Sequence, residues 1–302
     1  MEKAILKTLI YADIFDYPLT IFEVHKWLIG MKVTLRQVEK ALKKLNQESR
    51  IKNKGEYYFL HGKHRLVSKR QRRQTQSAQY LRKAQLITIF LKAIPWIKLV
   101  GVSGGLAMDN ADKNDDIDLF IITSKNRLWI SRLLALGLLS LTGQRRKAGD
   151  LGQKIAGKLC INTLLEEDKL EQANKDIYLA HEVLQMKVLW QRNGIYSKYL
   201  LDNEWVFKFL PSWVGDARGP ATSSLRGVKR RSNLINKEIA TPFGLAMTDY
   251  LERLAKWFQL KVMRKPEGME RIEDGALYFH PQDCRPKVLA EYGQKLKKII
   301  SP

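Results

Sequence analysis

The sequence is poor in cysteine, and this shortage argues against two kinds of structure. Its two cysteines, Cys160 and Cys284, stand far apart, and neither belongs to a Cys-x-x-Cys pair or to another metal-ligand spacing. The pattern therefore favours neither a disulfide-stapled extracellular domain nor a cysteine-based zinc site. We expect both thiols to be reduced, as is typical of the cytoplasm.

Long apolar runs are also missing. The longest, over 128–141, is interrupted by Arg132 and is shorter than the roughly 20 residues that span a bilayer. Residues 1–9 lack the apolar core and the small-residue cleavage site of a signal peptide. We expect a cytoplasmic protein with no membrane partner, in which 128–141 forms a buried helix.

Acidic residues are scarce relative to basic ones. The 302 residues include 53 Lys and Arg but 31 Asp and Glu, which gives a formal net charge of +22. Such a field attracts polyanions, and nucleic acid is the commonest of them because each neutralised phosphate releases a counterion. A negatively charged membrane surface is the weaker alternative. With 45% hydrophobic and 28% charged residues, the composition is that of an ordinary folded protein.

The N-terminal region predicts a small helical unit followed by a hairpin. Apolar spacing indicates helices over 2–12, from Thr20 onward and over 34–47. Thr20 and Glu23 have the spacing of a capping box. Two short strand-like runs within 50–60 surround an Asn-Lys-Gly turn. The order resembles a winged helix-turn-helix with 34–47 in the recognition position, although such modules also serve as packing or dimerisation domains.

Basic side chains gather in three segments, and we expect these to contact nucleic acid. The first is the helix over 34–47, and the second begins a connecting helix over 66–95. The third is a Gly-, Pro-, Ser- and Arg-rich loop over 214–232 that is expected to be mobile. The alternative for each charge run is a merely solvated face. The candidate contacts are Arg36, Lys40, Lys43, Lys44, Lys69, Arg70, Arg72, Arg73, Arg226, Lys229, Arg230 and Arg231.

The middle of the chain has the pattern of buried strands. Strands are predicted over 97–102 and 117–123, and a third candidate covers 158–165. The predicted fold class is α+β, with an N-terminal winged helix-turn-helix, a central mixed sheet with flanking helices, and a helical C-terminal region. Further helices are expected over 176–199, 241–263 and 287–300. The predicted division is 1–65, a winged-helix domain; 66–95, a connecting helix; 96–172, the domain of the sheet; and 173–302, a helical C-terminal domain.

Two acids at the start of the second predicted strand are the candidate catalytic and metal-binding residues. Asp116 and Asp118 stand at positions i and i+2, which project from the same face of a strand. Two carboxylates side by side can hold a divalent cation, and hard oxygen ligands suit Mg²⁺ or Mn²⁺. A nucleotide's phosphates would complete the coordination sphere.

A glycine turn precedes these acids. Gly104 and Gly105 allow the backbone to approach a phosphate closely, and a helix beginning there would add oriented amide donors. A triphosphate and a cation would then meet at one place, which is the arrangement used for nucleotidyl transfer. We expect Ser103, Gly104 and Gly105 to bind the phosphates of a nucleoside triphosphate (NTP) substrate.

The glycine turn and the Asp116-Ile117-Asp118 motif resemble the DNA polymerase β-like nucleotidyltransferase superfamily. Its signature is a Gly-Ser turn followed, after about ten residues, by Asp-x-Asp. The resemblance covers roughly 97–165 and implies a nucleotidyltransferase domain over 96–172. The structural alternative is an acidic loop that leads into an ordinary strand.

The sequence departs from the family pattern at two places. The family's phosphate-binding serine falls on Gly105, although Ser103 lies two residues earlier and could substitute for it. The resemblance also implies a third carboxylate from a later strand, acting as general base. The candidates for this third group are Asn162, whose side chain cannot accept a proton from a hydroxyl, and Glu166.

Three functions fit these features. The first is transfer of a nucleoside monophosphate from an NTP to a hydroxyl, with RNA, including tRNA, favoured as acceptor because of the net charge. The second is a nucleic-acid-binding regulator in which the winged helix acts and the transferase fold is degenerate. The third is an antitoxin-like enzyme that attaches nucleotides to a protein.

Overall fold

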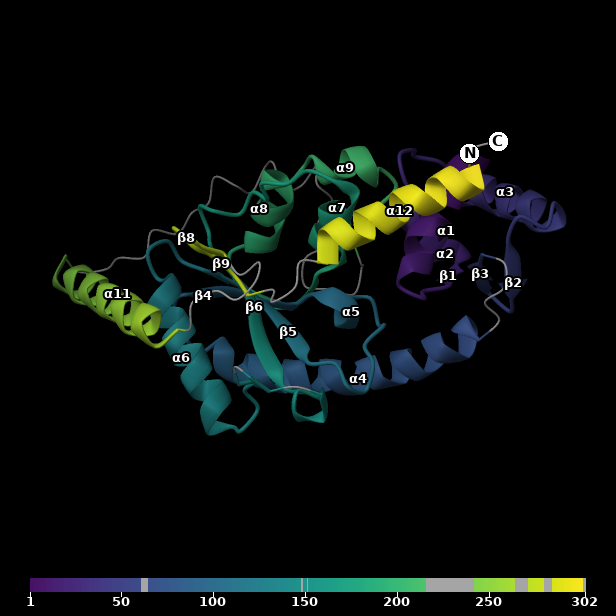
Figure 1. Ribbon diagram of the computed structural model, residues 1–302. Helices are drawn as coiled ribbons and strands as arrows, with labels where there is room; N and C mark the ends of the chain where they lie inside the picture. The colour runs from purple at the N-terminus through teal and green to yellow at the C-terminus, as the bar shows by residue number, and fades with distance from the viewer. Residues whose placement is uncertain are drawn as a thin grey trace.

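The computed structural model describes residues 1–60, 65–147, 149–150, 152–215, 242–263, 271–279 and 284–300. Within them the fold is mixed α+β, with a small N-terminal unit beside a larger central sheet (Figure 1). No described helix combines the length and the apolar character that crossing a membrane requires. The predicted loop over 214–232 and its four basic residues, Arg226, Lys229, Arg230 and Arg231, fall outside the described residues from position 216 onward.

The N-terminal unit forms three helices and a three-stranded antiparallel sheet in the order β1-β3-β2. The predicted capping box at Thr20 and Glu23 is confirmed, and a second one joins Thr34 to Gln37. These caps satisfy free amides at the two helix starts, so the helices begin where the sequence predicts. The elements are α1 (Glu2–Ile14), β1 (Leu19–Thr20), α2 (Ile21–Lys26), α3 (Leu35–Gln47), β2 (Lys52–Lys54) and β3 (Tyr57–Phe59).

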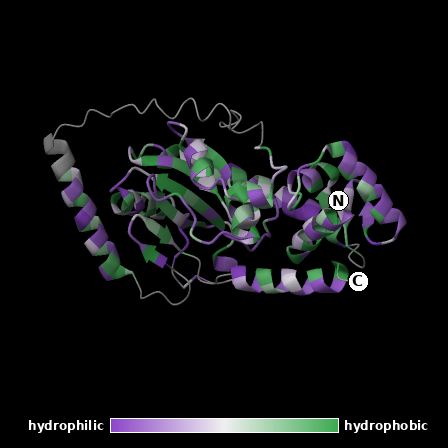
Figure 2. Ribbon diagram, turned by 90° about the horizontal axis from the view of Figure 1, so that it is seen from above, coloured by the Kyte–Doolittle hydropathy of each residue, from purple (hydrophilic) through white to green (hydrophobic). Residues whose placement is uncertain are grey.

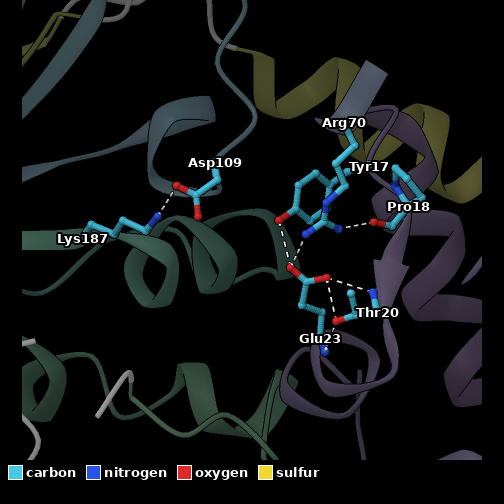
Figure 3. Close-up of polar contacts among 7 residues, drawn as sticks. All are labelled: Tyr17, Pro18, Thr20, Glu23, Arg70, Asp109 and Lys187. Carbon is cyan, nitrogen blue, oxygen red and sulfur yellow. Dashed lines mark hydrogen bonds and ion pairs between the residues drawn. The ribbon is translucent and has the colours of Figure 1, made fainter. Parts of the chain in front are cut away.

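Helix α4 (Leu66–Leu91) runs from this unit along the central sheet (Figure 1). Near its start, Arg70 is 2% exposed and reaches back into the N-terminal unit. Its guanidinium donates to the Pro18 carbonyl and, at 2.5 Å, to Oε1 of Glu23, and it lies 4.1 Å from the centre of the Tyr17 ring (Figure 3). A buried charge is tolerated only when it is paired in this way. Arg70 therefore joins α4 to the N-terminal unit.

The central sheet has six strands in the order β7-β4-β5-β6-β9-β8. Strands β5 and β6 are parallel, and the other neighbouring pairs are antiparallel. The predicted strands over 97–102, 117–123 and 158–165 correspond to three consecutive strands of this order, β4, β5 and β6. The strands are β4 (Ile97–Val102), β5 (Ile117–Thr123), β6 (Leu159–Glu166), β7 (Lys187–Gln191), β8 (Arg271–Glu273) and β9 (Ala276–Tyr278).

Both faces of the sheet are covered, which explains the continuous apolar runs of β4 and β5. On one face, Val100 and Ile121 pack with α4 and with α6 (Leu128–Leu141), the helix predicted over the longest apolar run. On the other face, Leu99 and Ile122 pack with α7 (Ile177–Gln185), α8 (Ile195–Asp202) and the N-terminal unit. The middle of the sheet is accordingly largely hydrophobic in Figure 2.

The prediction of helix throughout 176–199 is wrong in the middle. Helix α7 ends at Gln185, and Lys187–Gln191 forms β7, which pairs with β4 at one edge of the sheet. Gly194, with a φ of +66°, then precedes α8 as its N-cap residue. An edge strand gains its backbone hydrogen bonds from a neighbour distant in sequence, so local periodicity does not reveal it.

The region over 173–302 is not purely helical, because β7 and the β8–β9 hairpin belong to the central sheet. The two long C-terminal helices, α11 (Pro242–Val262) and α12 (Cys284–Ile300), agree with the expected helices. Helix α12 packs along α1, where Lys295 pairs with Asp13 at 2.8 Å (Figure 1). The short elements are α5 (Gly104–Ala107), the 3-10 helix η1 (Gly152–Lys154) and α9 (Val206–Phe209).

Candidate functional site

The glycine turn lies directly against the acid-bearing strand. Strand β4 ends at Val102, which pairs with Leu119 of β5, and the Ser103 amide donates to the Asp118 carbonyl at 3.1 Å. The single-turn helix α5 then begins at Gly104. Antiparallel pairing of β4 with β5 thus brings two segments more than ten residues apart in sequence into contact.

Position 104 requires a glycine, both because of its backbone conformation and because the Asp118 carboxylate lies close to it. Its φ is +62°, in the left-handed region that side chains disfavour. A Cβ at this position would lie 3.2 Å from Oδ2 of Asp118, closer than most Cβ contacts. The absence of a side chain therefore lets the turn approach the carboxylate.

Asp116, Asp118 and Cys160 form a compact cluster. One potential ligand atom from each residue lies within 4.8 Å of the others. Asp116 immediately precedes β5, Asp118 is its second residue, and Cys160 is the partner of Asp118 in the parallel pairing with β6. All three side chains are partly exposed, so the cluster reaches the surface.

The cluster concentrates negative charge in a poorly solvated place. Desolvation, and then the charge of Asp116, raise the pKa of Asp118 well above its usual value. Burial and the charges of Asp118 and Asp116 raise the pKa of the Cys160 thiol to about 12, so the thiol is protonated at neutral pH. A bound cation would offset this unfavourable charge.

Arg146 already neutralises part of the cluster. Its Nη1 donates to Oδ2 of Asp116 at 2.6 Å, and its backbone amide donates to the Leu159 carbonyl at 2.9 Å. The second bond holds the segment after α6 against the start of β6. Sequence reasoning missed Arg146, because a basic residue between Arg145 and Lys147 gives no signal of a specific partner.

The two predicted third groups lie elsewhere on β6. Glu166 pairs with Thr123 at the other end of the strand, six residues beyond Cys160, which corresponds to about 20 Å along the strand. Asn162 is buried and falls at the register irregularity between Ile161 and Thr163. Cys160 therefore occupies the place on β6 beside Asp118.

The Ser103 hydroxyl is a notable polar group at this site. It is buried, and the described residues give it no hydrogen-bond partner. Buried polar atoms are normally paired, so an orphan next to the glycine turn is compatible with a ligand or a water there.

A cavity of about 200 Å³ opens on the other side of the glycine turn. Gly104 and Gly105 form one wall, Tyr11 of α1 and Trp27 after α2 contribute aromatic rings, and α7 contributes His181 and Glu182. The His181 ring stacks on Tyr11, with centroids 4.2 Å apart, and on Trp27 at 5.0 Å. Burial lowers the pKa of His181 to about 3, so this ring is neutral and acts as a wall.

Glu182 is the acidic group of this cavity. Burial raises its pKa to about 7, and the Gln185 carboxamide donates to its Oε1. Its charge also contributes to the raised pKa of Asp118, because both acids lie near the glycine turn. Glu182 was not among the residues predicted from sequence, and only its place within an amphipathic helix would have drawn attention to it.

The predicted nucleic-acid contacts separate into exposed and internal groups. Arg36, Lys40, Lys43 and Lys44 on α3 are exposed, although Lys43 pairs with Glu39 and Lys44 with Glu2. Along α4, Arg72 is exposed, whereas three neighbours have internal partners. Lys69 pairs with Asp16 at 2.6 Å, Arg73 donates to Asn110 at 3.2 Å, and Arg70 is buried. The prediction for Arg70 is therefore corrected, because its guanidinium faces the interior.

Comparisons with protein-family models, with curated proteins and with solved structures each found no match to this chain. The functional argument therefore depends on the site. It consists of two carboxylates beside a glycine turn, a thiol and an arginine at the same cluster, and an aromatic cavity on the far side of the turn.

Proposed function

We propose that the protein is a metal-dependent nucleotidyltransferase that transfers a nucleoside monophosphate from an NTP to a hydroxyl, with RNA as the acceptor. The observation that carries the proposal is the cluster of Asp116 and Asp118 against the turn at Gly104. The spacing of these residues resembles the DNA polymerase β-like superfamily. The positive net charge supports a polyanionic acceptor over a small neutral one.

Asp116 and Asp118 would hold Mg²⁺ or Mn²⁺. Carboxylate oxygens are the ligands that these hard cations prefer, whereas the protonated Cys160 thiol is a poor ligand for them. A cation bound here would polarise phosphoryl oxygens and stabilise the charge of the pyrophosphate leaving group. Two protein carboxylates leave further coordination positions for the phosphates of the substrate.

The chain's own groups would position the triphosphate. The glycine turn permits close approach of backbone amides to phosphate oxygens, and the unpaired Ser103 hydroxyl can supply another donor. Arg146, next to Asp116, can exchange its carboxylate partner for a phosphate oxygen, because a guanidinium binds both. The site thus provides positive groups around a pair of acids.

The N-terminal unit supports nucleic acid as the partner. Its order of elements, α1-β1-α2-α3-β2-β3, with an antiparallel β1-β3-β2 sheet, is the order of a winged helix. In that interpretation α3 is the recognition helix. Four of its basic side chains, Arg36, Lys40, Lys43 and Lys44, are exposed and can neutralise phosphates.

The test is incorporation of radiolabelled nucleotide into RNA or into protein, with Mg²⁺ or Mn²⁺ present. We expect labelled RNA, and we expect Asp116→Asn and Asp118→Asn each to reduce the rate at least 100-fold. Asp274→Asn is the matched control, because that side chain is 97% exposed and remote from the cluster. Incorporation that survives both site substitutions would refute the assignment.

A nucleic-acid-binding regulator is the second candidate, and the pairing of Asp116 with Arg146 favours it. An arginine paired with one metal-binding acid, and a thiol instead of a carboxylate beside the other, are features expected of a degenerate site. This candidate predicts binding to duplex DNA without incorporation of nucleotide. Label recovered in protein alone would instead favour the protein-modifying alternative.

A further inference from the structure

The cavity and the acid cluster both border the glycine turn. Gly104 lines the cavity, and the same residue lies against Oδ2 of Asp118. A molecule with phosphates at the cluster could therefore extend past the turn into the cavity. The N-terminal unit closes the opposite side, because Tyr11 and Phe15 of the α1 region and Trp27 after α2 also line it.

The size and the walls of the cavity suit a flat ring. An apolar cavity of about 150 Å³ is large enough for benzene, so about 200 Å³ has the scale of a one- or two-ring ligand. Five aromatic side chains and His181 surround the space. Phe15 is 37% exposed, so this residue is partly open to solvent. Aromatic faces bind nucleobases by stacking, whatever the base.

Glu182 supplies the group that can distinguish one base from another. Its carboxylate accepts hydrogen bonds, and the Gln185 donor fixes its orientation. Guanine presents two adjacent N–H donors on one edge, which match the two oxygens of a carboxylate. Adenine and cytosine place an acceptor next to the donor, and uracil places acceptors on both sides of its N–H, so each would repel a carboxylate.

The protonation of Glu182 in the absence of ligand is consistent with its proposed hydrogen bonds to guanine. Its apolar surroundings disfavour the charge and hold its pKa at about 7. A ligand that donates two hydrogen bonds would stabilise the ionised form. The titratable groups that line the cavity with Glu182 are Tyr11 and Tyr17 from the N-terminal unit, Tyr178 and His181 from α7, and Cys284 at the start of α12. Asp118 lies across the turn.

We propose that this cavity binds the base of the donor nucleotide and that Glu182 selects guanine, so that GTP is the preferred substrate. The inference rests on the proposed nucleotidyltransferase function, because it places the phosphates at Asp116 and Asp118. Stacking on the aromatic walls gives affinity for any base, and Glu182 gives the preference.

The experiment compares guanosine, GTP and ATP in binding and transfer assays with the full-length protein. We expect wild type to bind GTP at least 10-fold more tightly than ATP by isothermal titration calorimetry with Mn²⁺. In Glu182→Gln a carboxamide replaces the carboxylate at equal size. We expect this variant to lose that preference and to bind ATP as well as or better than GTP, because a carboxamide matches the donor and acceptor of adenine.

Two further variants separate selectivity from folding. Glu171→Gln, whose side chain is 60% exposed in its pair with Lys175, is the control and should keep the wild-type preference. Phe15→Ala should weaken GTP and ATP equally, because stacking is independent of the base. A GTP-to-ATP ratio that Glu182→Gln leaves unchanged, in a protein that still transfers nucleotide through Asp118, overturns the inference and leaves the proposed function standing.

Guanosine, which has no phosphates, tests the cavity assignment independently of nucleotide transfer. If guanosine binds wild type and Glu182→Gln abolishes this binding, but no nucleotide is transferred, the cavity assignment stands and the proposed function fails. If neither guanosine nor any NTP binds wild type, the cavity assignment is overturned.

Discussion

Cys160 on β6 is the direct partner of Asp118 on β5, so a thiol rather than a third carboxylate lies beside the pair of acids. Its Sγ and one oxygen from each of Asp116 and Asp118 lie within 4.8 Å of one another. The thiol adds no charge, because burial and the two acids raise its pKa to about 12. The cluster therefore has a carboxylate pair rather than a triad.

Replacing Cys160 by aspartate should complete the triad. We expect Cys160→Asp to bind Mn²⁺ at least 10-fold more tightly than wild type, because a third hard ligand joins the cluster. Isothermal titration with the metal alone measures this effect. Cys160→Ser, which adds no charge, is the control and should stay within about twofold of wild type. Equal affinity in all three proteins would show that residue 160 does not face the cation.

Substitution of Gly104 should affect both stability and binding. Gly104→Ala forces a side chain into the left-handed region, at a cost of about 1–2 kcal/mol in the free energy of unfolding, and brings Cβ to 3.2 Å from Oδ2 of Asp118. We expect it also to weaken Mn²⁺ and NTP binding at least 10-fold.

The control for Gly104 is Gly143, which has a φ of +65° and open space around its Cβ position. Gly143→Ala should show a similar loss of stability in urea unfolding but unchanged binding. If both variants bind like wild type, crowding at the carboxylate has no part in the site.

The pH dependence of stability should reveal the raised pKa of Glu182. Its pKa is about 7 in the folded protein and about 4.5 in the unfolded chain, so the folded state holds the proton more tightly between these values. The contribution of Glu182 to stability is therefore present below pH 4.5 and decreases as the pH rises to about 7. Urea unfolding of wild type and Glu182→Gln at pH 5 and pH 8 measures it. Wild type should lose stability relative to the variant at the higher pH; an equal difference at both pH values would contradict the assignment.

Substitutions of Arg70 and Arg72 should have very different effects on stability, although both residues lie near the start of α4. Arg70→Ala should lower the free energy of unfolding by about 3–5 kcal/mol, because it leaves Glu23 without its buried partner. Arg72 is exposed, so Arg72→Ala should leave stability within about 0.5 kcal/mol of wild type. Its effect should instead be weaker RNA binding and a shallower salt dependence in a filter-binding assay. A loss of stability in Arg72→Ala would show that its interpretation as a solvent-facing contact is wrong.

Sequence patterns were sufficient to predict the helices and strands that interactions between nearby residues determine. The helix over 34–47 follows from its apolar stripe and its cap, and the strands over 97–102 and 117–123 follow from apolar runs buried on both faces. The positions of Asp116 and Asp118 relative to the glycine turn also follow from sequence, because a strand, a turn and a second strand bring them together. Arg70 shows the limit of prediction from sequence. Its charge suggests a residue at the surface, but the structure buries it in a pair with Glu23.

Only the tertiary structure decided which other side chains join the site. Cys160 reaches Asp118 through the register of two parallel strands, and Arg146 reaches Asp116 because its segment is held to the start of β6. Glu182 lines the cavity beside the glycine turn because α7 packs against α5. The edge strand β7, which periodicity did not predict, follows α7 and pairs with β4. The sequence by itself determined the local elements and the pair of acids, since hydrogen bonds and apolar periodicity act over a few residues. The rest of the site depends on burial and pairing between segments far apart in the chain, and these exist only once the sheet has formed.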